Sequence, residues 1–288
     1  MSLKSPVLGK SGFEHLPSVE AELNYLVPMA EKPVNYTFEP PPGIPRHNGT
    51  YETHRLPIRN ARSIAPNLSL DREGFALATH TSKVQDFYDD EEVRHVYYPE
   101  AEQLLVELTG GFRAVVFDHN VRNILRAQQG ESNAKEPVQR VHNDFTARSG
   151  FSRARAELTA RGIEDADTLL QHRFAVINVW RPITGPVQAS PLAVCDAASI
   201  APTDWVAGAL VYRDRIGETY AVTYSSTHRW FYFPQLQRNE AILIKCFDSA
   251  EEGRARFTAH TAFDDPTTPP NAPPRESIEL RSFVFYKA

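Results

Sequence analysis

The sequence predicts a mainly β protein of the α+β class, built on a two-sheet jelly roll or barrel with helices packed outside. Eight short segments are rich in β-branched and aromatic residues and are bounded by Pro, Gly, Asp or Asn, as strands usually are. Long helices do not alternate with these segments, which argues against a βαβ architecture. The 288 residues, 41% of them hydrophobic, are enough for a sizeable buried core.

Residues 1–65 are expected to form an extended N-terminal arm that packs on the body of the protein. The stretch "FEPPPGIPRHNG" is dense in Pro and Gly, and successive prolines favour extended conformations. Residues 66–288 are expected to form the body, a single β domain.

Two helical regions accompany the predicted strands. In "YYPEAEQLLVELTGG", at the end of the helical region expected from residue 83 to 109, leucines recur at helical spacing and two glycines supply a stop. A second helical region is expected over residues 149–173. The predicted strands are residues 113–119, 174–182, 191–197, 208–213, 219–225, 229–234, 240–248 and 277–286.

Composition excludes several classes of function. A net charge of −5 provides no basic field for nucleic acid or anionic lipid. Two cysteines argue against a disulfide framework and suit a reducing compartment. No apolar run resembles a signal peptide or reaches the length of a membrane helix. We therefore expect a cytoplasmic protein with a small-molecule substrate and no nucleic-acid or membrane partner; a homodimer is compatible with the sequence.

The stretch "QRVHNDFTARSG" contains a His-x-Asp pair, His142 and Asp144. Alternate residues of a strand point to the same side, so the two side chains can converge on one ion. Two histidines and one carboxylate would leave three positions of an octahedral Fe(II) free for a cosubstrate and O2. The pair alone is a weak signal, because Asp144 could instead cap a following helix in a surface turn.

A third ligand must come from farther along the chain, and the candidates are His228 and His260. A 2-oxoglutarate cosubstrate needs a cation and a hydroxyl for its distal carboxylate, which would be costly to bury alone. Arg275 and Ser277 lie two residues apart at the head of the last predicted strand, downstream of His260. Arg238 follows His228 without a neighbouring hydroxyl. The order of residues therefore favours His260.

Two other cations could hold the cosubstrate carboxylate instead of Arg275. Arg181 follows "INVW" and would project near the site if that strand lies inside the roll. Lys245 is a lone cation in the apolar strand "AILIKCF", where an unpaired buried charge would be expensive. The simpler interpretation of Lys245 is a side chain that faces outward with its stem along the surface. The choice between these cations stays open at this point.

Seven segments together resemble the fungal AsaB-type (CmcJ-like) hydroxylase/desaturase family, which is related to the small component of bacterial cephamycin 7α-hydroxylase. They are "VHNDFT", "NVWRP", "PLAVCD", "HRWFYFP", "EAILIKCFDS", "AHTAFDDP" and "PRESIELRSFVFY". The resemblance runs from about residue 110 to the C-terminus. It implies a cupin-like double-stranded β-helix, with His142, Asp144 and His260 as the catalytic metal ligands. It also implies that Arg275 and Ser277 bind the cosubstrate.

The expected function is that of an Fe(II)/2-oxoglutarate-dependent dioxygenase that uses O2. The reaction would be oxidative tailoring of a secondary metabolite such as a meroterpenoid, by ferryl hydrogen abstraction. The family's outcomes include hydroxylation, desaturation, and endoperoxide or ring formation. Two other classes remain: a metal enzyme independent of 2-oxoglutarate, such as an isomerase or cyclase, and a non-catalytic accessory subunit of an oxygenase.

Overall fold

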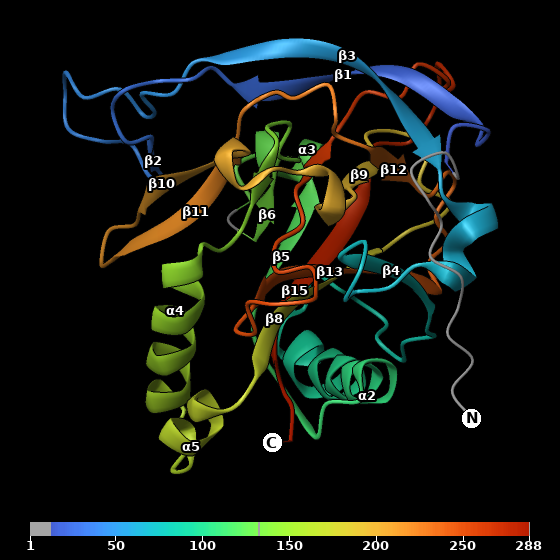
Figure 1. The fold of residues 1–288 in the computed structure, drawn as a ribbon. Helices are drawn as coiled ribbons and strands as arrows, with labels where there is room; N and C mark the ends of the chain where they lie inside the picture. Colours follow the sequence, from blue (N-terminus) through green and yellow to red (C-terminus); the bar gives the residue numbers. More distant parts are fainter. Residues whose placement is uncertain (1–12, 132, 288) are drawn as a thin grey trace.

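Two curled, mixed β-sheets pack face to face in the computed structural model, which describes residues 13–131 and 133–287 (Figure 1). The larger sheet has nine strands, in the spatial order β1 (Ser18–Leu26), β3 (Tyr51–Asn60), β12 (Trp230–Tyr232), β9 (Leu192–Cys195), β14 (His260–Ala262), β7 (His142–Asn143), β11 (Ile216–Val222), β10 (Trp205–Val211) and β2 (Val34–Tyr36). The smaller sheet has six, in the order β4 (Phe75–Thr79), β13 (Glu240–Asp248), β8 (Phe174–Pro182), β15 (Glu276–Phe285), β5 (Arg113–Asn123) and β6 (Ala134–Lys135).

The largest hydrophobic cluster lies between the two sheets. Leu192 and Val194 of β9 contribute to it from the larger sheet, and Val176 and Trp180 of β8 contribute from the smaller one. Successive strand residues point to opposite faces, so the alternate residues of β8, such as Val179, belong to a second cluster behind the smaller sheet. The face of β9 that carries Val194 therefore looks into the roll.

In the part of the chain that the structure describes, five α-helices flank the sheets, together with short 3₁₀ and π turns. They are α1 (Asp90–Glu92), α2 (Tyr98–Thr109), α3 (Ile124–Gln128), α4 (Ala147–Ala160) and α5 (Ala166–Gln171). The turns are η2 (Arg62–Asn67), η3 (Val93–Tyr97), η4 (Ala197–Ser199) and η5 (Pro202–Asp204). Helix α2 has a proline in its first turn and ends at Gly110, whose φ of 71° allows the left-handed cap. Its apolar side, which includes Leu104 and Leu105, covers the outer face of the smaller sheet.

Helix α4 begins directly after the His-x-Asp segment, and its N-terminal cap fixes the conformation of the chain there. Its cap is Thr146, whose hydroxyl accepts a hydrogen bond from the backbone N–H of Ser149 at 3.0 Å, while the Ser149 hydroxyl accepts one from the N–H of Thr146 at 2.8 Å. Gly150 lies so close to the ring of Phe247 on β13 that a Cβ would approach it to 2.5 Å. The small residue thus lets α4 pack tightly beside the smaller sheet.

The predicted fold class is confirmed: a strand-rich, jelly-roll protein with helices outside. All eight predicted strands are present, as β5, β8, β9, β10, β11, β12, β13 and β15. The helical region predicted over residues 83–109 contains α1, η3 and α2, and the region over 149–173 contains most of α4 and all of α5.

The N-terminal segment contributes strands to the larger sheet. β1 pairs antiparallel with β3 over nine residues, and β3 pairs with β12, so both belong to the hydrogen-bonded body of the sheet. Part of the predicted arm, residues 1–12, lies outside the described residues. The division of the chain into an arm and a body at residue 65 stays a prediction.

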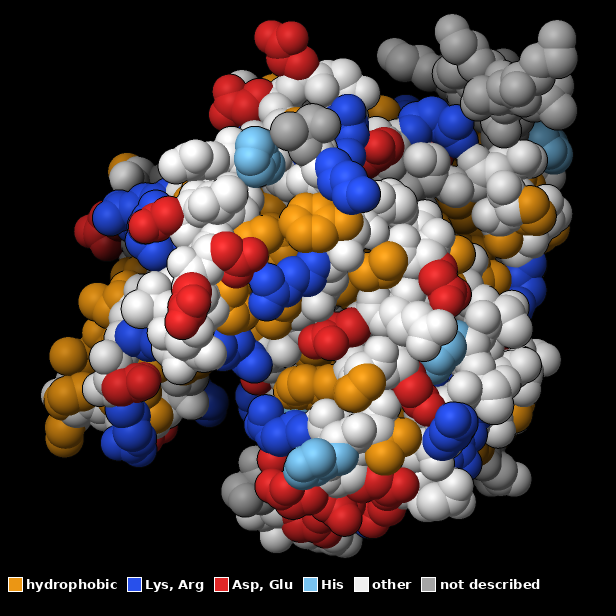
Figure 2. Space-filling view, turned by 90° about the horizontal axis from the view of Figure 1, so that it is seen from below, with side chains coloured by type: hydrophobic (Ala, Val, Ile, Leu, Met, Phe, Trp, Pro, Cys, Tyr) orange, Lys and Arg blue, Asp and Glu red, His pale blue; other side chains and the backbone are white. Residues whose placement is uncertain are grey.

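Within residues 13–131 and 133–287, none of the helices combines the length and the apolar character needed to cross a bilayer. On the face shown in Figure 2, apolar side chains lie near the centre among basic and acidic ones, and acidic side chains gather at the lower edge.

Candidate active site

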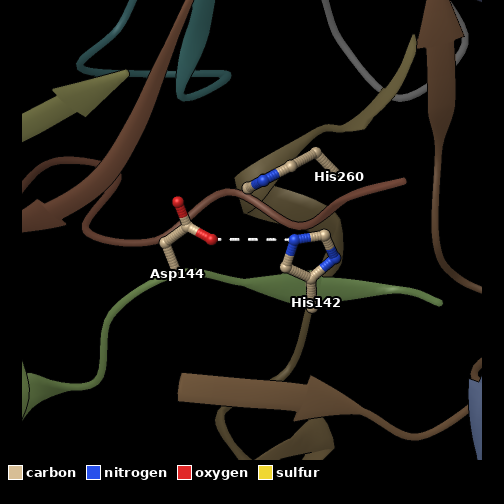
Figure 3. A group of neighbouring side chains, drawn as sticks. All are labelled: His142, Asp144 and His260. Atoms are coloured by element: carbon tan, nitrogen blue, oxygen red, sulfur yellow. Dashed lines mark ion pairs between the residues drawn. The ribbon is translucent and has the colours of Figure 1, made fainter. Parts of the chain in front are cut away.

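Strand pairing brings His142, Asp144 and His260 together on the inner face of the larger sheet. β7 pairs antiparallel with β14, and His142 lies directly opposite His260, which in turn lies opposite the inward-facing Val194. One ligand atom from each of the three side chains lies within 4.8 Å of the other two. Figure 3 shows the two imidazoles and the carboxylate pointing toward a common centre. The arrangement forms a possible metal site of two histidines and one carboxylate.

Backbone carbonyls orient both imidazoles. Nδ1 of His142 lies 2.8 Å from the carbonyl oxygen of Arg140, and Nδ1 of His260 lies 3.1 Å from that of Thr258. These pairings place the proton on Nδ1 and leave the Nε2 lone pair of each ring free for a metal. Burial and the adjacent His260 lower the pKa of His142 to about 3, so its ring is neutral near pH 7, as a ligand must be.

Asp144 is held through one of its two oxygens. Oδ2 accepts hydrogen bonds from Asn178 Nδ2 at 2.9 Å and from Arg281 Nε at 2.8 Å, whereas Oδ1 lies 3.7 Å from His142 Nε2. Burial alone would raise the pKa of Asp144, but Arg281 and the two histidines outweigh it and hold that pKa well below its usual range. The carboxylate thus stays ionised, and its Oδ1 remains free beside the imidazoles. Neutral imidazoles and a carboxylate on one side of the site fit Fe(II).

Arg275 is a buried cation that lacks a carboxylate partner in the part of the chain described here. Its side chain is 5% exposed, and its guanidinium lies 5.4 Å from the centre of the Trp180 ring. Nη1 donates to the carbonyl oxygen of Ser190 at 2.6 Å, and Nε has no hydrogen-bond partner. Burial, reinforced by nearby Arg122, lowers the pKa of Arg275 to about 9. A buried, unneutralised guanidinium of this kind is suited to an anionic ligand.

Ser277 and Arg122 extend this cationic region. Ser277 is 1% exposed, and its hydroxyl has no hydrogen-bond partner among the described residues. It faces Arg122 across the β15–β5 pair. Nη1 of Arg122 donates to the carbonyl oxygen of Glu136 at 2.7 Å, and burial lowers the pKa of Arg122 as well. Two guanidiniums and a free hydroxyl on neighbouring strands match the distal carboxylate of a small dicarboxylate.

The structure does not bring Arg181 to this site. Asn178 and Trp180 of β8 face into the roll, so Arg181 points to the opposite side of the smaller sheet. Its Nη2 donates to the carbonyl oxygen of His80 at 3.2 Å, and its guanidinium lies 5.3 Å from the Tyr97 ring. The expectation that Arg181 could bind the cosubstrate is therefore corrected: it is a structural arginine beneath η3.

His228, the alternative third ligand, is also used elsewhere. Its Nδ1 lies 3.1 Å from the hydroxyl of Tyr25, and its Nε2 lies 3.0 Å from Asp204 Oδ2. Trp230 donates to the same tyrosine hydroxyl at 2.7 Å. Both ring nitrogens are engaged in this network, away from the three-residue cluster.

Lys245 neither faces outward nor reaches the site. Its side chain is 0% exposed, and Nζ forms ion pairs with Asp71 and, at 2.8 Å, with Asp248. Arg173 bonds the same two carboxylates at 2.9 and 2.7 Å. The expected surface position is thus wrong, because carboxylates neutralise the charge inside the protein.

We expect Lys245→Ala to lower the free energy of unfolding by about 2–3 kcal/mol, because it removes one of the two cations that neutralise the buried carboxylate of Asp248 and leaves only Arg173. Urea denaturation followed by circular dichroism measures the change. Arg254→Ala is the control: Arg254 bonds Asp71 at 3.0 Å from a side chain that is 31% exposed, so we expect a loss of about 1 kcal/mol or less. Equal losses in the two variants would contradict this interpretation.

A pocket of about 280 Å³ opens beside Asp144. Helix α4 forms one wall and the β10–β11 hairpin forms the other. Asp144 and Arg281 lie at its inner end, and Phe117 and Phe145 add apolar surface. The pocket therefore connects the exterior with the side of the metal site that Asp144 occupies.

Asn178, Arg281 and Arg122 are functional candidates that sequence reasoning missed. Asn178 and Arg281 fix the carboxylate of Asp144, and Arg122 accompanies Arg275. A signal for Arg122 was present, because Asp118, Asn120 and Arg122 alternate along "FDHNVRN" and mark one polar face of a strand. No comparable signal marks Asn178, which lies in a strand whose nine residues are all buried.

Comparisons with known proteins agree with this geometry. A family model described as an oxidoreductase/YMDC permease-like domain matches residues 23–285. The alpha-ketoglutarate-dependent dioxygenase phiK of Fungal sp. (strain ATCC 74256) is 35% identical over 76% of this chain and 80% of phiK. The hydroxylase/desaturase efuI of Hormonema carpetanum is 30% identical over 94% of this chain and 96% of efuI.

A solved structure, that of the iron and alpha-ketoglutarate-dependent endoperoxidase NvfI, shares the fold. It superposes with a TM-score of 0.83 at 28% sequence identity, covering 94% of this chain and 99% of that chain. Residues 23–285, which the family model matches, include all three residues of the possible metal site. This chain therefore belongs to the fungal hydroxylase/desaturase family of Fe(II)/2-oxoglutarate-dependent dioxygenases.

Proposed function

We propose that the protein oxidises a small-molecule secondary metabolite at a C–H bond, with His142, Asp144 and His260 as the iron ligands. The observation that carries the proposal is their convergence on the inner face of the roll, with both Nε2 atoms and one Asp144 oxygen left free. Bound Fe(II), with 2-oxoglutarate and O2, supplies the oxidising power that breaks the C–H bond and converts the cosubstrate to succinate and CO2.

The protein's part in this reaction is positioning. Arg281 and Asn178 hold Oδ2 of Asp144, so that Oδ1 would be the oxygen available to bind Fe(II). Arg275, Ser277 and, from the facing strand, Arg122 hold the distal carboxylate of 2-oxoglutarate. The pocket beside Asp144 receives the substrate and limits access of water.

The chain works in the cytoplasm, consistent with its two unpaired cysteines. Its ligand is a small molecule and neither nucleic acid nor membrane. Enzymes of the family catalyse several reactions. Hydroxylation, desaturation and endoperoxide formation differ in what reaches the substrate carbon after hydrogen is removed. Dimerisation stays a prediction that analytical ultracentrifugation would test.

Anaerobic addition of Fe(II) and 2-oxoglutarate to the purified protein is expected to produce the visible metal-to-ligand charge-transfer band of a chelated 2-oxo acid. Admission of O2 should then convert 2-oxoglutarate to succinate. Succinate in place of 2-oxoglutarate is the control and should give no band, because it lacks the keto oxygen. A folded protein that develops no band with both components would contradict the proposal, and activity without 2-oxoglutarate would point to an isomerase or cyclase.

A further inference from the structure

The pocket beside Asp144 has an apolar body. Phe117 and Phe145 line it, as do Leu210 and Ile216 of the β10–β11 hairpin. Ile216 is 74% exposed, so an isoleucine at the edge of this pocket has little protein packed over it. Apolar surface on both walls suits a substrate with a hydrophobic frame.

Two arginines approach the same pocket from opposite walls. Arg153 of α4 bonds Glu157 at 2.8 Å, but that carboxylate is shared with Arg161 at 3.5 Å. Arg215 of the hairpin turn lies over the Tyr212 ring at 3.9 Å and forms no ion pair with any residue that the structure describes. Both guanidiniums line this one pocket, and burial and the positive charge of Arg215 lower the pKa of Arg153.

The carboxylates of the pocket are already engaged. Asp118 bonds Arg281 at 3.0 Å, and Glu218 bonds Lys32 at 2.6 Å. Asp144 is held by Arg281 and directed at the metal site. None of them neutralises Arg215. Because like charges that face each other are destabilising, an anion between the two walls would stabilise this arrangement.

We propose that this pocket binds an apolar substrate that carries a carboxylate, and that Arg215, assisted by Arg153, binds the carboxylate. The inference rests on the proposed function, because it treats the pocket as the place where substrate meets the iron site. With the carboxylate held at the hairpin, the apolar frame lies along Phe117 and Phe145. A carbon of that frame is then presented to the metal beside Asp144.

Two fluorescent dyes with one aromatic frame test this charge preference in the iron-free protein. Anilinonaphthalene-8-sulfonate carries an anionic group, and N-phenyl-1-naphthylamine is the same frame without it. We expect the sulfonate to bind about tenfold more tightly than the amine, as loss of one charge-assisted hydrogen bond implies. Arg215→Gln should weaken sulfonate binding about tenfold and leave binding of the amine unchanged, and Arg153→Gln should act in the same direction.

Neighbouring arginines supply matched controls. Arg213→Gln, in the same turn, removes a guanidinium that lies 4.8 Å from the Phe38 ring, outside the pocket. Arg155→Gln, on α4, removes a guanidinium bonded to Asp167 at 2.5 Å. Both controls should bind both dyes as the wild type does. Ala156→Trp fills the pocket from α4 and should weaken binding of both dyes.

Equal affinity of the wild-type protein for the two dyes would overturn the inference. Sulfonate binding that is unchanged in the Arg215→Gln variant would overturn it as well. Sulfonate binding that survives Ala156→Trp would also overturn it, because the anion site would then lie elsewhere. Dye binding requires neither iron nor 2-oxoglutarate. A normal charge-transfer band without dye selectivity therefore rejects this inference alone. Dye selectivity without a band rejects the proposed function and leaves an anion-binding pocket.

Discussion

Replacing His260 with Ala is expected to abolish the Fe(II)–2-oxoglutarate charge-transfer band and to stop O2-dependent succinate formation. Among the described residues, His260 is one of three side chains that converge at the site, and the two that remain are both on the short segment around β7. Loss of a residue that merely supports a metal ligand commonly lowers metal affinity ten- to a hundredfold. Loss of a ligand should exceed that range, so we expect a decrease of more than about a hundredfold in Fe(II) affinity.

His228→Ala is the matched control for this substitution. Both histidines are buried, with 2% exposure for His260 and 7% for His228, but His228 is bonded to Tyr25 and Asp204. We expect the His228 variant to lose stability and to keep the charge-transfer band. Metal titrations on protein whose circular dichroism is unchanged measure both variants. A band that survives in His260→Ala and disappears in His228→Ala would exchange the roles of the two histidines.

Local chemistry in the sequence was sufficient to predict most strands and the short-range half of the site. Strands such as β8 are rich in β-branched and aromatic residues, and the His142–Asp144 spacing needs only a strand to put both side chains on one side. The pairing of His142 with His260 is different. It depends on the register between β7 and β14, which are more than a hundred residues apart, and no local pattern encodes it.

The errors in predicting side-chain positions have a common physical cause. When every residue of a strand is buried, the sequence does not show which side chains point to which face of the sheet. All nine residues of β8 are buried, so nothing in the sequence distinguishes Asn178, which faces the site, from Arg181, which faces away. The position of Lys245 was predicted wrongly for a related reason. One of its two partners, Asp71, lies 174 residues away, and only the tertiary structure brings these two charges together. Side-chain direction in such strands is decided by distant partners.

Arg275→Met is expected to weaken 2-oxoglutarate binding strongly and to stabilise the protein without its cosubstrate. A hydrogen bond to a charged group contributes about 1.5–3 kcal/mol, so the dissociation constant should rise by about ten- to a hundredfold. In the absence of an anion, however, Arg275 is a buried cation whose pKa is lowered to about 9 by burial and by Arg122. An apolar side chain of similar length removes that desolvation cost, which stabilises the protein by typically about 1–4 kcal/mol. It also loses the hydrogen bond to Ser190, which costs about 1 kcal/mol. The free energy of unfolding should therefore rise by about 1 kcal/mol.

Arg229→Met separates this effect from the general consequences of losing a partly buried arginine. Arg229 bonds Asp196 at 2.6 Å, and Asp196 is 3% exposed, so the substitution strands a buried carboxylate and should destabilise the protein while 2-oxoglutarate affinity stays unchanged. Titration of the charge-transfer band gives the affinity, and urea denaturation of the metal-free protein gives the stability. Opposite signs of the stability change in the two variants would identify Arg275 as a cation kept unneutralised for a ligand, since a structural arginine has no reason to destabilise the fold that contains it. If Arg275→Met destabilised the protein and left the affinity unchanged, the cosubstrate carboxylate would have to be held by other residues.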